Sequence, residues 1–155
     1  MWLCFSLILT IILLGSDQVL KFWVASNVAP GIIKSFVPGL SLTNVKNSGA
    51  AWNLLTGQRW LLIIIAITAL VVIGYYCYQC RADACYELAL AFLLSGTIGN
   101  LINRVVNGQV IDMFQTTLIN FPVFNLADCD LTIGVIWLMA LIITNRRPIR
   151  NRGSR

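Results

Sequence analysis

Four long apolar segments alternate with polar stretches along the chain, and each is close to the length of a membrane-spanning helix. A helix needs about 20 residues to cross roughly 30 Å of hydrocarbon. The segments cover approximately residues 2–24, 60–78, 88–106 and 127–144. The second segment carries no charged residue, whereas the other three carry polar residues toward one end. This pattern predicts an all-α membrane protein with four transmembrane helices.

The composition excludes a soluble globular domain. Of the 155 residues, 58% are hydrophobic and only 11% are charged, and the mean hydropathy is +0.81. Average soluble proteins have about 45–50% apolar and about 25% charged residues, so a domain of this size could not bury so much apolar surface. The expected solvent is lipid.

The basic residues do not form a nucleic-acid-binding stripe. The net charge is +5, and the last ten residues hold five of the eleven Lys and Arg side chains: Arg146, Arg147, Arg150, Arg152 and Arg155. Such a cluster beside a span is typical of the cytoplasmic side of a membrane. Four spans bring both termini to one side, so we expect a cytoplasmic tail over residues 145–155 that contacts membrane lipids.

The two long polar segments, 25–59 and 107–123, then lie on the opposite side of the membrane. Residues 41–45 alternate polar and apolar side chains, as a strand with one buried face does. Residues 109–114 could pair with them. We therefore expect a small extracytoplasmic β-element. No repeat or flexible linker divides the chain, so residues 1–155 are expected to form a single domain.

The cysteines do not indicate a disulfide framework, because their number, five, is odd. Cys77, Cys80 and Cys85 are spaced closely enough to hold zinc in principle. The chain has no histidine and no second paired cysteine element, so reduced thiols at a membrane face are favoured over a metal site. We expect neither a metal nor an organic cofactor.

Two carboxylates stand out because each lies in a mainly apolar pentad: Asp112 in residues 110–114 and Asp128 in residues 124–128. Paired carboxylates in a low-dielectric site share a proton, so such a pair can deprotonate a water molecule and protonate a leaving amine. The lack of histidine removes Ser–His and Cys–His catalysis. A carboxylate pair remains as the candidate for hydrolysis.

Four motifs follow one another between residues 17 and 133: DQVLK from Asp17, NSGAAW from Asn47, GNLINR from Gly99 running on to Asp112, and FNLAD ending at Asp128. In this order they resemble the bacterial lipoprotein signal peptidases, the type II signal peptidase family of intramembrane aspartic proteases. The resemblance implies an aspartic endopeptidase of the bacterial inner membrane that cleaves a prolipoprotein before its diacylglyceryl-modified cysteine. It also implies inhibition by cyclic peptides of the globomycin kind.

The resemblance places the catalytic pair on Asp112 and Asp128. The other positions that match family motifs would bind substrate or support the site: Asp17, Lys21, Asn47, Gly49, Asn100, Arg104 and Asn125. Arg104 is suited to gripping a carbonyl group or a lipid head group. Asn103 departs from the family, which has an aspartate there that would neutralise Arg104 or shape the field of the pair. Asp130 could compensate for this loss or perturb Asp128.

Structural alternatives remain open for several of these residues. Asp128 could cap a helix, and Asp17 and Lys21, four residues apart, could simply form an intrahelical ion pair. Trp52 and Phe114 could belong to an interfacial aromatic belt or could enclose the substrate. A proton or ion transporter and a non-enzymatic scaffold are the competing functions, and a transporter requires polar residues through the whole depth of a pathway.

Overall fold

The computed structural model describes residues 2–146 and residue 148, and it confirms an all-α membrane protein with a small sheet. All four long helices are long and apolar enough to cross a membrane. Their bounds are Trp2–Asn27 for α1, Arg59–Cys80 for α2, Ala84–Asn107 for α3 and Leu126–Ile143 for α4. α3 begins four residues before the predicted start, because Asp83 caps it by accepting hydrogen bonds from the backbone of Cys85 and Tyr86.

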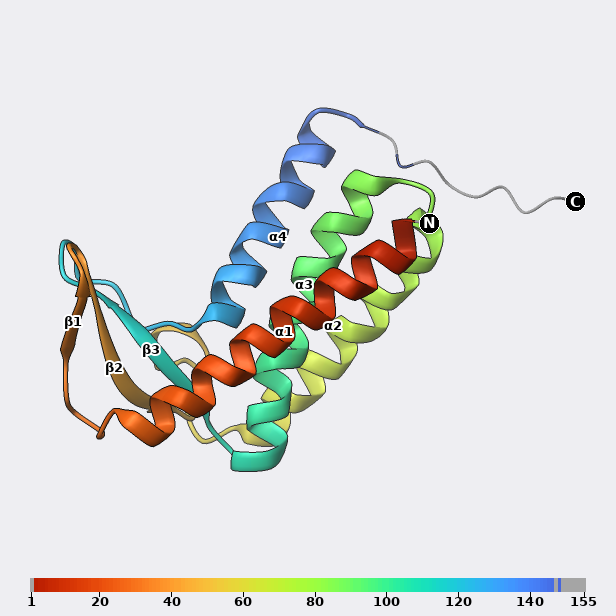
Figure 1. Ribbon diagram of the computed structural model, residues 1–155. Helices are drawn as coiled ribbons and strands as arrows, with labels where there is room; N and C mark the ends of the chain where they lie inside the picture. The colour runs from red at the N-terminus through yellow and green to blue at the C-terminus, as the bar shows by residue number, and fades with distance from the viewer. Residues whose placement is uncertain (1, 147, 149–155) are drawn as a thin grey trace, which may run out of the picture.

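Helix α3 occupies the centre of the bundle and packs against each of the other three helices (Figure 1). Two glycines permit this close approach. A Cβ atom on Gly99 would lie 2.7 Å from Asp17 Oδ2 on α1, and one on Gly96 would collide with the backbone of Ala127 on α4. Small residues are the usual means of bringing membrane helices together. Here they bring polar groups of three helices into one cluster.

A three-stranded antiparallel sheet lies at one end of the bundle, opposite the end where α1 begins (Figure 1). Its strands, in the spatial order β1-β2-β3, are Lys34–Val37, Leu40–Asn47 and Val110–Thr116. Strands β2 and β3 confirm the predicted pairing of the two polar segments. β1 escaped prediction because all four of its residues are exposed, which leaves no alternation to read.

The opposite end of the bundle carries the start of the predicted basic tail. Arg146 forms an ion pair with Asp83 at 3.4 Å and donates a hydrogen bond to Cys85 Sγ. Nearby, Ser6 Oγ of α1 donates to the buried Glu87 Oε2 of α3 at 2.5 Å. The remaining arginines of the tail, Arg147, Arg150, Arg152 and Arg155, lie outside the described residues.

Candidate active site

Asp112 lies on β3, where it is almost completely buried, with 3% of its surface exposed. Its Oδ2 accepts a hydrogen bond from Asn47 Nδ2 at 2.9 Å, and its Oδ1 accepts one from Asn125 Nδ2 at 2.6 Å. Burial raises the pKa of this carboxyl group to about 6, and the charge of Asp128 acts in the same direction against the two amide hydrogen bonds. Asp112 therefore keeps its proton to a higher pH than an ordinary aspartate does.

Asp128 lies in the first turn of α4 and forms a capping box with Asn125. The Asp128 backbone N–H donates to Asn125 Oδ1, and the Asn125 backbone N–H donates to Asp128 Oδ2, both at 3.0 Å. The second oxygen, Oδ1, accepts from Asn100 Nδ2 at 2.8 Å. The helix-cap interpretation is thus correct as geometry, and the cap orients the carboxylate toward Asn100.

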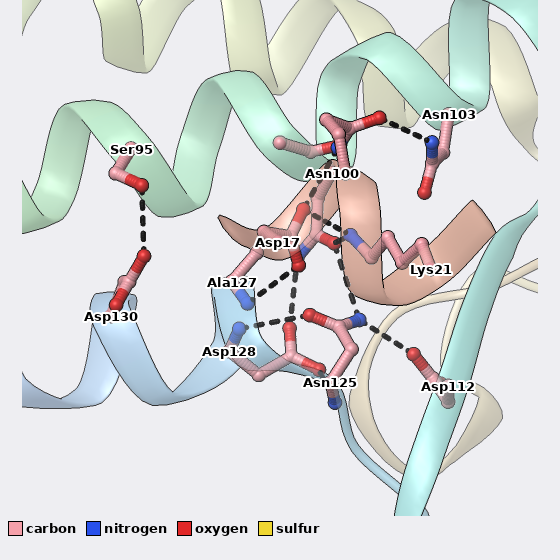
Figure 2. Close-up of polar contacts among 12 residues, drawn as sticks. Asp17, Lys21, Ser95, Asn100, Asn103, Asp112, Asn125, Ala127, Asp128 and Asp130 are labelled. Atoms are coloured by element: carbon pink, nitrogen blue, oxygen red, sulfur yellow. Dashed lines mark hydrogen bonds and ion pairs between the residues drawn. The ribbon is translucent and has the colours of Figure 1, made fainter. Parts of the chain in front are cut away.

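Two asparagines connect the carboxylates. The Asn125 amide nitrogen donates to Asp112 Oδ1 and, at 3.3 Å, to Asn100 Oδ1 (Figure 2). Its amide oxygen accepts a hydrogen bond from the backbone N–H of Asp128. Asn100 in turn donates to Asp128. The two aspartates come from separate elements, a strand and a helix, and a shared network of amides fixes them relative to each other.

Asp17 and Lys21 form a fully buried ion pair on α1, with 2.9 Å between Lys21 Nζ and Asp17 Oδ2 (Figure 2). Asp17 Oδ1 also accepts from the backbone N–H of Ala127, and Lys21 Nζ donates to Asn100 Oδ1, each at 3.0 Å. Neither residue lines the cavity that contains Asp112 and Asp128. These contacts favour structural support, because they fasten α1 to Asn100 and to the start of α4.

Gln18 was not singled out from the sequence, although it connects this cluster. Its amide nitrogen donates to Asp17 Oδ2 at 2.8 Å and to the Gly99 carbonyl at 3.1 Å, and its oxygen accepts from Asn103 Nδ2 at 3.1 Å. Its position in the sequence could have indicated this role, since an amide side chain within an apolar segment needs hydrogen-bond partners inside the protein.

Arg104 fastens α3 to the loop that follows β2. Its Nη2 donates to the Gly49 carbonyl at 3.1 Å, and the backbone N–H of Gly49 donates to Asn47 Oδ1 at 2.8 Å. Asn47 holds Asp112, so the chain of contacts runs from the arginine to the carboxylate. Gly49 contributes backbone atoms only, and Arg104 Nε has no hydrogen-bond partner among the described residues.

The contacts of residues 103 and 130 rule out direct neutralisation of Arg104 by either side chain, whereas an effect of either position on the field around the carboxylate pair stays a prediction. The Asn103 amide bonds to Gln18 on α1, whereas Arg104, the next residue on α3, points toward Gly49, because adjacent positions of a helix face different directions. Asp130 accepts a hydrogen bond from Ser95 Oγ at 2.8 Å and is 2% exposed. Asp130 is thus hydrogen-bonded to α3, and it forms no ion pair with Arg104.

Asp112 and Asp128 line one cavity of about 1020 Å³ beside the sheet. Its polar lining includes Asn47, Asn100, Arg104 and Asn125. Trp52, Phe121 and Phe124 form an aromatic wall, with ring centroids 5.9 Å apart for the first two and 5.8 Å for the last two. Phe114 packs behind this wall against Phe124 and does not line the cavity.

Four membrane-spanning helices with two carboxylates at one cavity have the arrangement of a membrane-embedded aspartic peptidase. The family model described as signal peptidase (SPase) II matches residues 9–144. The lipoprotein signal peptidase of Lactiplantibacillus plantarum is 45% identical over 90% of this chain and 93% of that protein. The one from Enterococcus faecalis is 40% identical over 92% and 90%.

Solved structures agree with this relationship. One described as a bacterial membrane enzyme superimposes with a TM-score of 0.87 at 30% identity, covering 97% of this chain and 94% of the other. A second with the same description gives a TM-score of 0.84 at 32% identity, covering 90% of this chain and 93% of the other. The chain therefore belongs to the signal peptidase II family, and it is a protease.

Proposed function

We propose that Asp112 and Asp128 are the catalytic pair of an aspartic endopeptidase that removes signal peptides from prolipoproteins, cutting before the diacylglyceryl-modified cysteine. One observation carries the assignment of the pair: two carboxylates from separate elements line one cavity and are joined through the amide of Asn125. The relatives' name, lipoprotein signal peptidase, supports the substrate class.

The geometry supports a division of roles between the two carboxyl groups. Asp112, with a pKa of about 6, carries the proton and donates a hydrogen bond to the scissile carbonyl oxygen. Asp128 takes a proton from a water molecule, whose oxygen attacks the carbonyl carbon while Asp112 protonates the carbonyl oxygen. Collapse of this intermediate returns a proton to Asp112 and transfers the proton on Asp128 to the amine nitrogen as the C–N bond breaks.

The cavity also supports the membrane-derived part of the substrate. Its aromatic and aliphatic wall, which includes Trp52, Phe121 and Ile133, would accept the diacylglyceryl chains, and the free Nε of Arg104 would bind a backbone carbonyl. Cyclic peptides of the globomycin kind would inhibit by filling the same space. The sheet would lie outside the inner membrane of a bacterial cell and both termini in the cytoplasm, as the basic tail suggests.

The substrate is tested with purified protein in detergent. We expect cleavage of a diacylglyceryl-modified prolipoprotein, with the new N-terminus at the modified cysteine as determined by mass spectrometry. The matched control is the same precursor without the lipid, which should remain uncut. Equal cleavage of both precursors would contradict a lipid-dependent peptidase, and cleavage at another bond would contradict the assigned position.

The pH dependence of cleavage tests the division of roles. We expect kcat/KM to fall as pH rises above about 6, because Asp112 then loses the proton that it must donate. The hydrogen bond from Asn47 lowers the pKa of Asp112, so Asn47→Ala should move this decline to higher pH. Asn120→Ala, which changes the same cavity without touching Asp112, is the control. A decline that stays in place in Asn47→Ala would assign it to another group.

A transporter is the weaker candidate. The carboxylate pair and its cavity lie beside the sheet, and at the other end of the bundle the buried Glu87 is bonded directly to Ser6. Asp130, between these two ends, is bonded to Ser95. Glu87 and Asp130 are thus each hydrogen-bonded to a hydroxyl group, and neither lines the cavity of the carboxylate pair.

A further inference from the structure

The ribbon formed by β2 and β3 separates two cavities. Residues of one face, Val45 and Asn47 on β2 with Val110 and Asp112 on β3, line the catalytic cavity. Lys46 and Ile111, which pair with each other between them, line a second cavity of about 530 Å³. Successive side chains of a strand point to opposite faces, so the two cavities lie on opposite faces of the β2–β3 pair.

The second cavity is polar and positively charged. Six of its nine lining residues offer amide or ammonium groups: Gln18, Lys21, Lys46, Asn103, Asn107 and Gln109. None of the nine is acidic. The charge of Lys21 is balanced by Asp17, whereas no acidic side chain of the described residues forms an ion pair with Lys46. The cavity therefore favours an anion that can accept several hydrogen bonds.

One lining residue has an unsatisfied acceptor. Asn103 is 6% exposed, its amide nitrogen donates to Gln18, and within the described part of the chain its buried Oδ1 has no hydrogen-bond partner. Buried polar atoms in proteins are nearly always paired, with protein, water or ligand. The phosphodiester of a lipid head group has no donor for this oxygen at neutral pH, because its oxygens are ionised or esterified. A hydroxyl group next to the phosphate would satisfy it.

The remaining wall of the cavity continues onto a surface suited to acyl chains. Phe22 and Ala25 of α1 line the cavity, and Phe22 is 75% exposed. Val19, three residues earlier on the same helix face, is 69% exposed. In a membrane-spanning helix such apolar side chains face lipid. A ligand with its polar end in the cavity could extend its apolar part along them.

We propose that this cavity binds a glycerol-phosphate group, with the phosphate at Lys46 and the neighbouring amides and a glycerol hydroxyl donating to Asn103 Oδ1. The group could be supplied by the head group of an anionic glycerophospholipid, whose acyl chains would lie along Val19 and Phe22, or by a soluble glycerol phosphate. The site lies behind the strand pair that carries Asp112, so binding does not depend on the catalytic carboxylates.

Binding is tested by native mass spectrometry of the full-length protein in detergent. The probes are dihexanoyl-phosphatidylglycerol, the same lipid with a choline head group, glycerol 3-phosphate and inorganic phosphate. Two variants alter the cavity. Lys46→Gln removes its unpaired cation, and Asn103→Asp adds a negative charge in place of the free acceptor. Lys34→Gln is the matched control, since it removes a lysine from exposed strand β1, outside the cavity.

We expect the phosphatidylglycerol analogue to bind more tightly than the choline lipid. Its dissociation constant should rise roughly tenfold or more in both cavity variants, as for loss of a charge-assisted hydrogen bond, and stay unchanged in Lys34→Gln. Asp112→Asn should bind as the unaltered protein does, which separates this site from the catalytic one. Binding of the lipid alone would identify the membrane as the source, and tighter binding of glycerol 3-phosphate than of the lipid would identify a soluble source.

Three results would overturn the proposal. The first is equal binding of the two lipids, and the second is unchanged binding in both Lys46→Gln and Asn103→Asp. The third is an equal loss in Lys34→Gln, which would indicate attraction to the sheet as a whole. Inorganic phosphate bound as tightly as glycerol 3-phosphate would exclude a role for the glycerol hydroxyl group. Melting temperatures of the variants establish that each comparison is made on folded protein.

Discussion

Asparagine in place of either Asp112 or Asp128 is expected to reduce cleavage of a diacylglyceryl-modified prolipoprotein by roughly a thousandfold or more, within the range for loss of a general acid or base. The amide has nearly the shape of the carboxyl group and can keep some of its hydrogen bonds, but it can neither remove a proton from water nor deliver one to the leaving amine. The rate of product formation by purified protein measures the effect.

Asp130→Asn is the matched control for this experiment. It changes a buried aspartate two residues along α4, and asparagine can still accept the hydrogen bond from Ser95. Activity close to that of the unaltered protein is expected there. Retained cleavage in Asp112→Asn or Asp128→Asn would exclude that residue from the chemistry. Unchanged thermal unfolding of the variants would show that any loss is chemical.

Replacing Lys21 by methionine is expected to lower the free energy of unfolding by about 3–5 kcal/mol, because it leaves the Asp17 carboxylate buried without its cation. Both side chains are almost completely buried, at 2% and 0% exposure, so water cannot compensate for the loss. The variant also removes a donor to Asn100, so cleavage should decrease as well. Equilibrium unfolding in mixed micelles measures the stability.

The double variant Asp17→Asn, Lys21→Met separates the two causes. It removes both charges, so most of the stability lost in Lys21→Met should return, since a neutral pair is cheaper to bury than a single charge. The amide oxygen introduced by Asp17→Asn could still accept from the backbone N–H of Ala127, as the carboxylate does. A double variant as unstable as Lys21→Met alone would show that the lysine acts through packing and not through charge.

Much of the fold followed from hydropathy. The charge-free segment 60–78 lies within α2, and the alternation at residues 41–45 lies within β2. Helix ends were less predictable, because they depend on caps: Asp83 starts α3 and Asn125 starts α4 through side-chain contacts with particular backbone N–H groups. Strand β1 could not be predicted, since its pairing with β2 leaves no side chain buried.

The site was predictable as a set of residues but not as an arrangement. Motif order indicated Asn100 and Asn125, yet their function as a bridge between the carboxylates depends on the close packing of α3 on α4. Direct neutralisation of Arg104 from position 103 was expected from their adjacency in the sequence, but the Asn103 amide bonds to Gln18 while Arg104 bonds to Gly49. The role of Gln18 was not predictable either, because it depends on contacts with Gly99 and Asn103 of another helix.

If Asp128 is catalytic, as proposed above, the capping box of α4 makes one carboxylate responsible for both helix order and chemistry. Helix ends open and close more readily than helix centres, and each opening of this turn would withdraw Asp128 from Asn125 and from the reacting water. On that assignment, the opening and closing of this single turn would limit the fraction of molecules competent for hydrolysis. By the same linkage, a ligand that binds Asp128 should slow hydrogen exchange of the backbone amides at Asn125 and Asp128. Deuterium uptake at this helix end would then report the fraction of protein with ligand bound.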